Sequence, residues 1–153
     1  MDSTTTLEPV LADAAEAAGF NAVFAVEEGL SWVAIAADET ALALEWRADA
    51  RRLVLSAEVG SLEAADGEML RLLLRYNARW RETGGLRFAL DEVDVAALVL
   101  DLPVDALDGN WLADVLAGFA EAAADWRRVL SNPAATKSST GDTVHRLDEA
   151  GRV

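Results

Sequence analysis

The pattern of hydrophobic positions is most pronounced between residues 62 and 80, where leucines and aromatic residues recur at helical spacing. At about 100° per residue, the apolar side chains of this segment cover an arc of roughly 200°. They are Met69, Leu70, Leu72, Leu73, Leu74, Tyr76 and Trp80, and the narrow polar stripe carries Glu68, Arg71, Arg75 and Arg79. One sheet covers only about half of such an arc. The segment therefore predicts a helix with a second apolar surface, for which another copy of the chain is the simplest partner.

Two further segments have helical spacing. Over residues 6–18, leucines and alanines repeat along one face, with Pro9 in the first turn and Gly19 as a stop. The second segment begins after Asp108, a good N-cap, and ends at the Ser-Asn-Pro sequence of 131–133. Its apolar stripe consists of Trp111, Leu112, Val115, Leu116, Phe119, Ala122, Ala123, Trp126, Val129 and Leu130.

Short apolar segments between turn signals predict the strands. Residues 22–26 are expected to be extended, and 30–36, 41–46 and 53–59 are stronger strand candidates. After the leucine-rich helix, the Thr-Gly-Gly stop at 83–85 is followed by strands over 86–90 and 95–102, which form a hairpin. The predicted order is α-β-β-β-α-β-β-α. It indicates an α+β fold in which helices pack on a curved antiparallel sheet.

Residues 1–130 are expected to form one domain, because a chain of 153 residues suits a single core. Residues 131–153 are polar and aperiodic, which predicts a disordered tail. Cysteine is absent, and the chain has neither a signal-peptide start nor an apolar run long enough to span a membrane. We therefore expect a cytoplasmic protein without membrane insertion.

The chain is strongly acidic, with 27 Asp and Glu against 13 Lys and Arg and a net charge of −14. Charges in the predicted tail cancel, so the excess lies in the predicted domain. A surface of this sign repels phosphate backbones, which argues against nucleic-acid binding. The charge either keeps a self-associating protein soluble or steers a basic partner towards it.

Residue sets that carry enzyme chemistry are missing. His145 is the only histidine and lies in the predicted tail. The Gly84-Gly85 pair closes a helix and does not form a phosphate-binding loop. Carboxylates such as those of Asp91 and Glu92 fall in turns, where they are normally solvated. We expect no catalytic residue, no metal and no cofactor, and the pattern favours protein binding.

Several stretches resemble the class I chaperones of bacterial type III secretion, the family that includes the chaperone of the Tir effector. They are LRLLLRYNARWRETGGLRFALDE, LVLDLPVDAL and the closing helix WLADVLAGFAEAAADW, and the likeness covers about residues 7–130. The resemblance implies a homodimer in the bacterial cytoplasm that binds the non-globular N-terminal region of a secreted effector and keeps it secretion-competent. An export ATPase or a regulatory protein would be a further partner.

The resemblance also implies two sets of contact residues. The dimer side would carry Leu70, Leu73, Leu74, Asn77 and Trp80. Hydrophobic grooves for the client would be lined by Leu7, Leu11, Phe20, Phe24, Leu30 and Trp32. The alanine-rich first helix and the C-terminal tail depart from the family pattern, which leaves the depth of the grooves and the identity of the client open.

Alternatives remain at two levels. A protein of the same fold could sequester another cytosolic protein and couple secretion to transcription, whereas an enzyme or small-ligand carrier has no residue set to support it. Trp80 could cap its helix instead of joining a dimer, and Trp32 could belong to the core. The arginine row of the leucine-rich helix is either a solvated face or a docking stripe for acidic residues.

Overall fold

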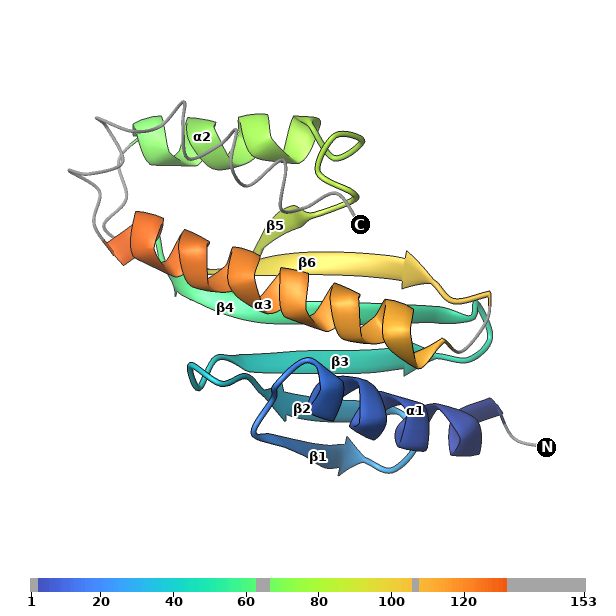
Figure 1. Cartoon of the computed structure of the whole chain (residues 1–153). Helices are drawn as coiled ribbons and strands as arrows, with labels where there is room; N and C mark the ends of the chain where they lie inside the picture. The colour runs from blue at the N-terminus through green and yellow to red at the C-terminus, as the bar shows by residue number, and fades with distance from the viewer. Residues whose placement is uncertain (1–2, 63–66, 106–107, 132–153) are drawn as a thin grey trace.

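The computed structural model describes residues 3–62, 67–105 and 108–131, and their side chains from Leu7 onward. The helices and strands of this part are α1 (Ser3–Ala17), β1 (Ala22–Glu27), β2 (Ser31–Ile35), β3 (Ala41–Arg47), β4 (Arg52–Ser61), α2 (Gly67–Ala78), β5 (Arg87–Leu90), β6 (Val95–Pro103) and α3 (Gly109–Ser131). Figure 1 shows α1 and α3 on the same face of one sheet, with α2 beyond the β5 end of the strand order.

The sheet is antiparallel throughout, in the order β1-β2-β3-β4-β6-β5. The predicted α+β class and antiparallel sheet are confirmed. The predicted element order is wrong in one respect, because four strands and not three precede α2. The additional strand is β1, whose side chains are largely exposed. An edge strand of this kind lacks the alternation by which a half-buried strand is recognised in a sequence.

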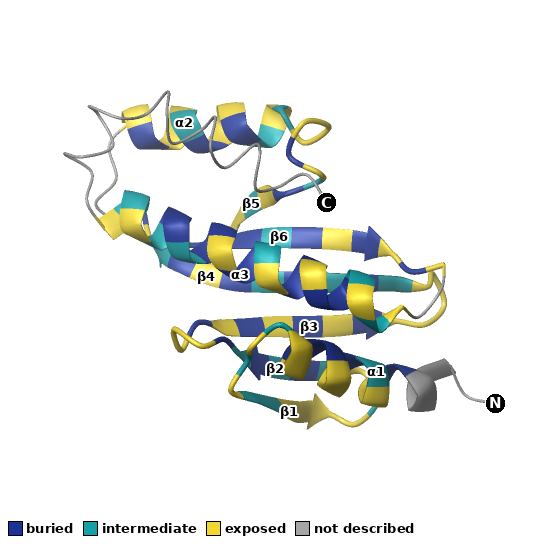
Figure 2. Cartoon of the chain, in the orientation of Figure 1, coloured by how far each residue is buried: buried dark blue, intermediate teal, exposed yellow. Residues whose placement is uncertain are grey.

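The core lies between the sheet and the two helices on its face. Burial alternates along β3, where Leu42, Leu44 and Trp46 are buried and the residues between them are exposed. Strands β4 and β6 alternate in the same way. Helix α3 covers this face with side chains such as Phe119 and Trp126, and α1 lies beside α3 (Figure 2). The alternate side chains of each strand point to the opposite face of the sheet, which no helix of the described structure covers.

Two positions fix how α3 lies on the sheet. Asp108 caps the helix as predicted, because its carboxylate accepts the backbone N–H groups of Asn110 at 2.9 Å and Trp111 at 3.3 Å. Near the other end, Gly60 sits at an irregularity in the β4–β6 pairing with a φ of 152°. A Cβ atom there would lie 3.3 Å from the Cβ of Leu130, so glycine permits the close approach of α3 to β4.

The ends of the first and last helices differ from the predicted ones. Helix α3 includes Ser131, which the sequence assigned to the tail, and residues 132–153 lie outside the described part. Helix α1 begins at Ser3, three residues before the predicted start, so Pro9 lies inside the helix and not in its first turn. Proline at that position removes one N–H group from the helical hydrogen-bond ladder.

Helix α2 is shorter than predicted and ends at Ala78, so Trp80 belongs to the following turn. Its packing partner among the strands is β5. Tyr76 of α2, Phe88 of β5 and Trp126 of α3 meet edge to face, with ring centroids 4.7 to 5.3 Å apart. This aromatic cluster joins the second helix to the rest of the domain.

Candidate protein-binding surfaces

Exposed apolar side chains gather at the β1 edge of the sheet. Phe24 is 58% exposed and Val26 is 69% exposed, and Leu30 in the following turn is also exposed. Strand β1 pairs with β2 on one side only, and no strand of the described residues pairs with its other side. An unpaired strand edge flanked by exposed apolar residues can accept an extended segment of another protein.

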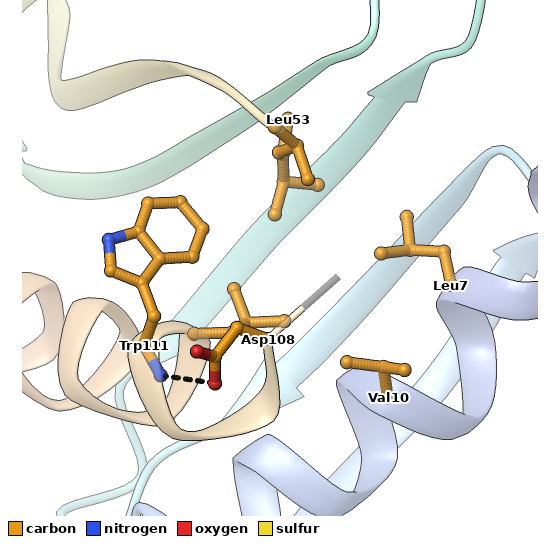
Figure 3. A pocket seen from close by; sticks show the side chains of 7 residues that line it. Leu7, Val10, Leu53, Asp108 and Trp111 are labelled. Carbon is orange, nitrogen blue, oxygen red and sulfur yellow. Dashed lines mark hydrogen bonds between the residues drawn. The ribbon is translucent and has the colours of Figure 1, made fainter. Parts of the chain in front are cut away.

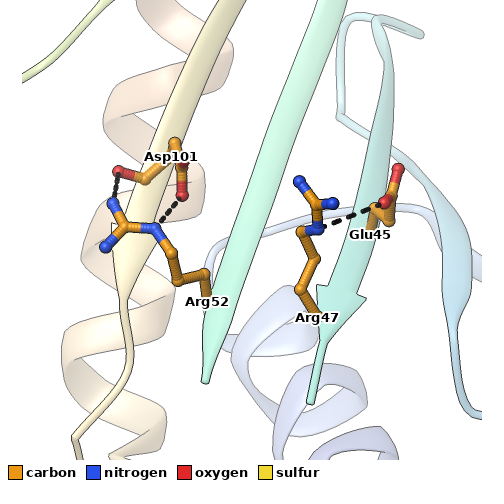
Figure 4. Close-up of polar contacts among 4 residues, drawn as sticks. All are labelled: Glu45, Arg47, Arg52 and Asp101. Atoms are coloured by element: carbon orange, nitrogen blue, oxygen red, sulfur yellow. Dashed lines mark hydrogen bonds and ion pairs between the residues drawn. The ribbon is translucent and has the colours of Figure 1, made fainter. Parts of the chain in front are cut away.

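The helix-free face of the sheet adds a row of small and apolar residues. The strand register places Phe24, Val33, Ala43, Ser56 and Val99 side by side across five strands. Towards one end of this face the row gives way to charged residues (Figure 4). There Arg52 forms an ion pair with Asp101 at 2.7 Å, and Arg47 lies 4.0 Å from Glu45. The apolar row therefore continues from the β1 edge towards the middle of the sheet and has a polar border.

The six residues proposed for the client groove fall into two groups. Phe24 and Leu30 are exposed and Phe20 is half-buried. Leu7, Leu11 and Trp32 are fully buried between α1 and the sheet, so they offer no surface to a partner while α1 is in place. Val26 is absent from the predicted set although it is the most exposed of the large apolar side chains of β1. Its position two residues after Phe24, which places both side chains on one face of a strand, was the available signal.

Two hollows in the surface lie apart from the exposed apolar residues at the β1 edge. The first lies between α1 and α3, is lined by Leu7, Val10 and Trp111 among others, and has a volume of about 10 Å³, about the least that a single water molecule needs (Figure 3). The second, of about 540 Å³, lies where α3 ends beside β4. Its Arg127 is already engaged, because the guanidinium donates to the carbonyl of Glu58 at 3.0 Å and to the hydroxyl of Thr40 at 3.1 Å.

Helix α2 presents apolar residues in two directions, as its wide arc predicted. Met69, Leu73 and Tyr76 are buried against the domain. Leu70 and Leu74 point away from it, and Leu74 is 68% exposed. These two positions are one helical turn apart and therefore lie on one stripe. The domain covers the first set and leaves the second without a partner in the described chain.

Beyond the end of α2, Trp80 is exposed and two guanidinium groups lie over its ring. The distances to the ring centroid are 4.7 Å for Arg81 and 5.6 Å for Arg87. Cations in this position are attracted by the face of the indole. Trp80 is therefore an anchored but accessible aromatic group next to the exposed stripe of α2.

Asn77 faces β5 and is half-buried. Its side-chain oxygen accepts the N–H of Phe88 at 2.7 Å, and its side-chain nitrogen donates to the carbonyl of the same residue at 3.1 Å. Both ends of the amide are thus used within the subunit. Leu73, like Asn77, faces the domain, so of the five residues proposed for the dimer side only Leu70, Leu74 and Trp80 are exposed.

The polar groups of the described residues show no other site. Among these residues, no three His, Cys, Asp or Glu side chains are grouped so that they could hold a metal ion. The helices of the described part are too short or too polar to cross a membrane.

Comparisons with known proteins agree with this architecture. A model of the Tir chaperone protein (CesT) family matches residues 10–127. The crystal structure of the ExsC-ExsE complex has a chain with a TM-score of 0.71 at 24% identity, covering 85% of this chain and 97% of that one. For the HopA1-SchA chaperone-effector complex the values are 0.66 and 19%, with 84% and 98% covered. No curated protein sequence matches.

A third similar structure is the Yersinia pestis type III secretion chaperone SycH in complex with a stable fragment of YscM2. Its TM-score is 0.59 at 23% identity, with 77% of this chain and 97% of that chain covered. The fold is therefore that of the type III secretion chaperones. The chain belongs to the Tir chaperone protein (CesT) family, because the family model spans most of its length. This confirms the resemblance found in the sequence.

Proposed function

We propose that this protein is a type III secretion chaperone that acts in the bacterial cytoplasm as a homodimer. It binds the non-globular N-terminal region of a secreted effector and keeps that region soluble and competent for secretion. The observation that carries the proposal is the group of exposed apolar residues, Phe24, Val26 and Leu30, beside the unpaired edge of β1. Family membership supports the same function.

The binding mode follows from the two features of this edge. An extended client segment can form main-chain hydrogen bonds with β1, which do not depend on its sequence, while its alternate side chains contact the apolar row on the sheet. Burying on the order of 1,000 Å² of apolar surface at about 25 cal/mol per Å² offsets the several kcal/mol lost when a disordered segment becomes ordered. Binding of this kind needs no nucleotide and no catalytic residue.

The homodimer is proposed to form through the exposed stripe of α2. Leu70, Leu74 and Trp80 are the contact residues, because their side chains are exposed on the described subunit. Leu73 and Asn77 face the domain on the other side of the helix. A two-fold axis beside α2 would bring the same stripe of both copies together, as a self-complementary interface requires.

Co-expression with candidate effectors encoded nearby, each truncated to its N-terminal region, tests the function. The unmodified chaperone should co-purify with one of them and keep it soluble. The amount of client that co-purifies with a Phe24→Ser, Val26→Ser double variant should be lower by about tenfold or more. The variant removes two exposed apolar contacts, each contributing about 1 kcal/mol or more to binding. Val93→Ser is the matched control, since Val93 is 71% exposed but lies in the turn between β5 and β6.

Two outcomes would contradict the proposal. One is that no N-terminal effector region is stabilised while a folded cytosolic protein is captured, which would favour the regulatory alternative. The other is equal client retention by the β1 double variant and the Val93 control, which would move the binding surface away from the β1 edge.

A further inference from the structure

The two edge strands of the sheet, β1 and β5, differ in whether other described parts of the chain cover them. At one edge, no side chain of the described residues hydrogen-bonds to the backbone of β1 (Ala22–Glu27). At the other edge, α2 and the turn after it lie along β5 (Figure 1). An uncovered edge is open to strand addition, whereas a covered edge is not.

The Asn77 side chain takes the place of a neighbouring strand on β5. In an antiparallel ladder, successive residues of a strand direct their N–H and C=O groups alternately to either side. Phe88 is opposite Leu98 of β6, yet both its N–H and its C=O bond to Asn77, at 2.7 Å and 3.1 Å. They therefore point away from β6, and the amide of Asn77 satisfies both groups as a paired strand would.

The side chain of Thr83 contacts a second backbone group near the β5 edge. Leu86 precedes Phe88 by two residues and lies just before the first residue of β5. The hydroxyl of Thr83 lies 3.2 Å from the carbonyl oxygen of Leu86, and Thr83 itself is fully buried. The outward-pointing groups of Phe88 and the carbonyl of Leu86, the residue just before β5, thus bond to side chains of the same subunit.

Helix α2 is held in this position independently of the two polar side chains. Leu73 is buried, and Tyr76 packs edge to face on both Phe88 and Trp126. The apolar contacts fix the helix near the edge, while Asn77 and Thr83 use the hydrogen-bonding groups that a foreign strand would need.

We propose that Asn77 and Thr83 are specificity-determining residues that close the β5 edge to strand addition and so direct an incoming strand to β1. The proposal rests on the proposed function in that it assumes a client that binds partly as a strand. Without this closure each subunit would offer two edges, and a strand or a second copy could pair with the wrong one.

Amide hydrogen exchange on the unmodified protein is the first test, because it needs neither a client nor a variant. The amide of Phe88 should exchange at least about tenfold more slowly than the β1 amides that point away from β2, since only the former is hydrogen-bonded. Equal exchange rates at the two edges would overturn the proposal.

A strand-forming probe tests the closure itself. The probe is a synthetic peptide with the sequence of residues 86–91, titrated into the unmodified protein and into an Asn77→Leu, Thr83→Val double variant of similar side-chain size. The unmodified protein should bind one peptide per subunit, with slower exchange in β1. The variant should bind a second peptide that slows exchange at Phe88. Asn110→Leu is the control, because it makes the same change at an exposed asparagine in the first turn of α3.

The outcomes separate this proposal from the proposed function. A folded double variant that still binds one peptide per subunit, or an unmodified protein that binds the peptide at β5, would overturn the closure by Asn77 and Thr83. If the double variant does not fold, Asn77→Asp replaces it, since aspartate keeps the acceptor for the Phe88 N–H and loses the donor to its carbonyl. Failure to capture any effector would count against the proposed function only.

Discussion

At the scale of single residues, Thr40 connects the turn between β2 and β3 to α3. It is buried in the turn between β2 and β3, and its hydroxyl accepts a hydrogen bond from Arg127 of α3 at 3.1 Å. Its N–H donates to the carboxylate of Asp38 at 3.0 Å. The Thr40 hydroxyl and N–H bonds, with a further contribution from the charge of Arg127, hold the pKa of Asp38 below its ordinary value of 3.8.

This network predicts how Asp38 contributes to stability in acid. Because its pKa is lower in the folded protein than in the unfolded chain, the stabilisation is complete above pH 3.8 and is lost as the pH falls through the folded value. Asp38→Asn should therefore flatten the decline of the free energy of unfolding below about pH 4, measured by urea denaturation at a series of pH values. Glu39→Gln, in the same turn, is the control, and an unchanged pH profile for Asp38→Asn would contradict the network.

At the scale of elements, the two apolar sides of α2 should respond differently to substitution. Leu73→Ala removes a side chain that is only 6% exposed and should lower the free energy of unfolding by about 2–4 kcal/mol. Leu74→Ser, at the exposed neighbour, should leave the isolated subunit almost as stable but weaken the dimer, so the midpoint of unfolding should lose its dependence on protein concentration. Thermal unfolding at several concentrations distinguishes the two effects. A concentration-independent midpoint for the unmodified protein would argue against the proposed dimer.

At the scale of the whole molecule, charge is distributed unevenly. Residues 67–90 contain five arginines and two glutamates, a net charge of +3, within a chain of net charge −14. In the proposed dimer the α2 segments, each positive, face one another, and the two acidic subunits also repel. Both effects are like-charge repulsion that salt screens over roughly 10 Å at 0.1 M ionic strength.

The dimer should therefore become tighter as salt is added. Sedimentation equilibrium between about 50 mM and about 500 mM NaCl should show a falling dissociation constant, since the Debye length shortens over this range. An Arg71→Gln, Arg75→Gln double variant should reduce the part of the effect that comes from the facing α2 segments, because both arginines are exposed on α2. A dissociation constant that rises with salt would instead indicate attractive charge pairs across the interface.

The sequence by itself determined which faces of the elements are apolar, because the periods of 3.6 and 2 are local properties of the chain. It therefore predicted the α+β class, the capping of α3 by Asp108 and the two-sided character of α2. It missed β1 as a full strand, since the exposed side chains of an edge strand show little alternation. It also extended the leucine-rich helix through Trp80, which the structure places in a turn.

Only the tertiary structure decided which apolar residues are available to a partner. Leu11 and Phe24 look equally apolar in the sequence, yet the first is buried between α1 and the sheet while the second lies at an edge that no described strand or helix covers. The hydrogen bonds between Asn77 and Phe88 were likewise invisible, because they depend on how α2 lies against β5 and not on any local pattern. Periodicity fixes the direction of a side chain within its own element, whereas burial depends on what the other elements place against it.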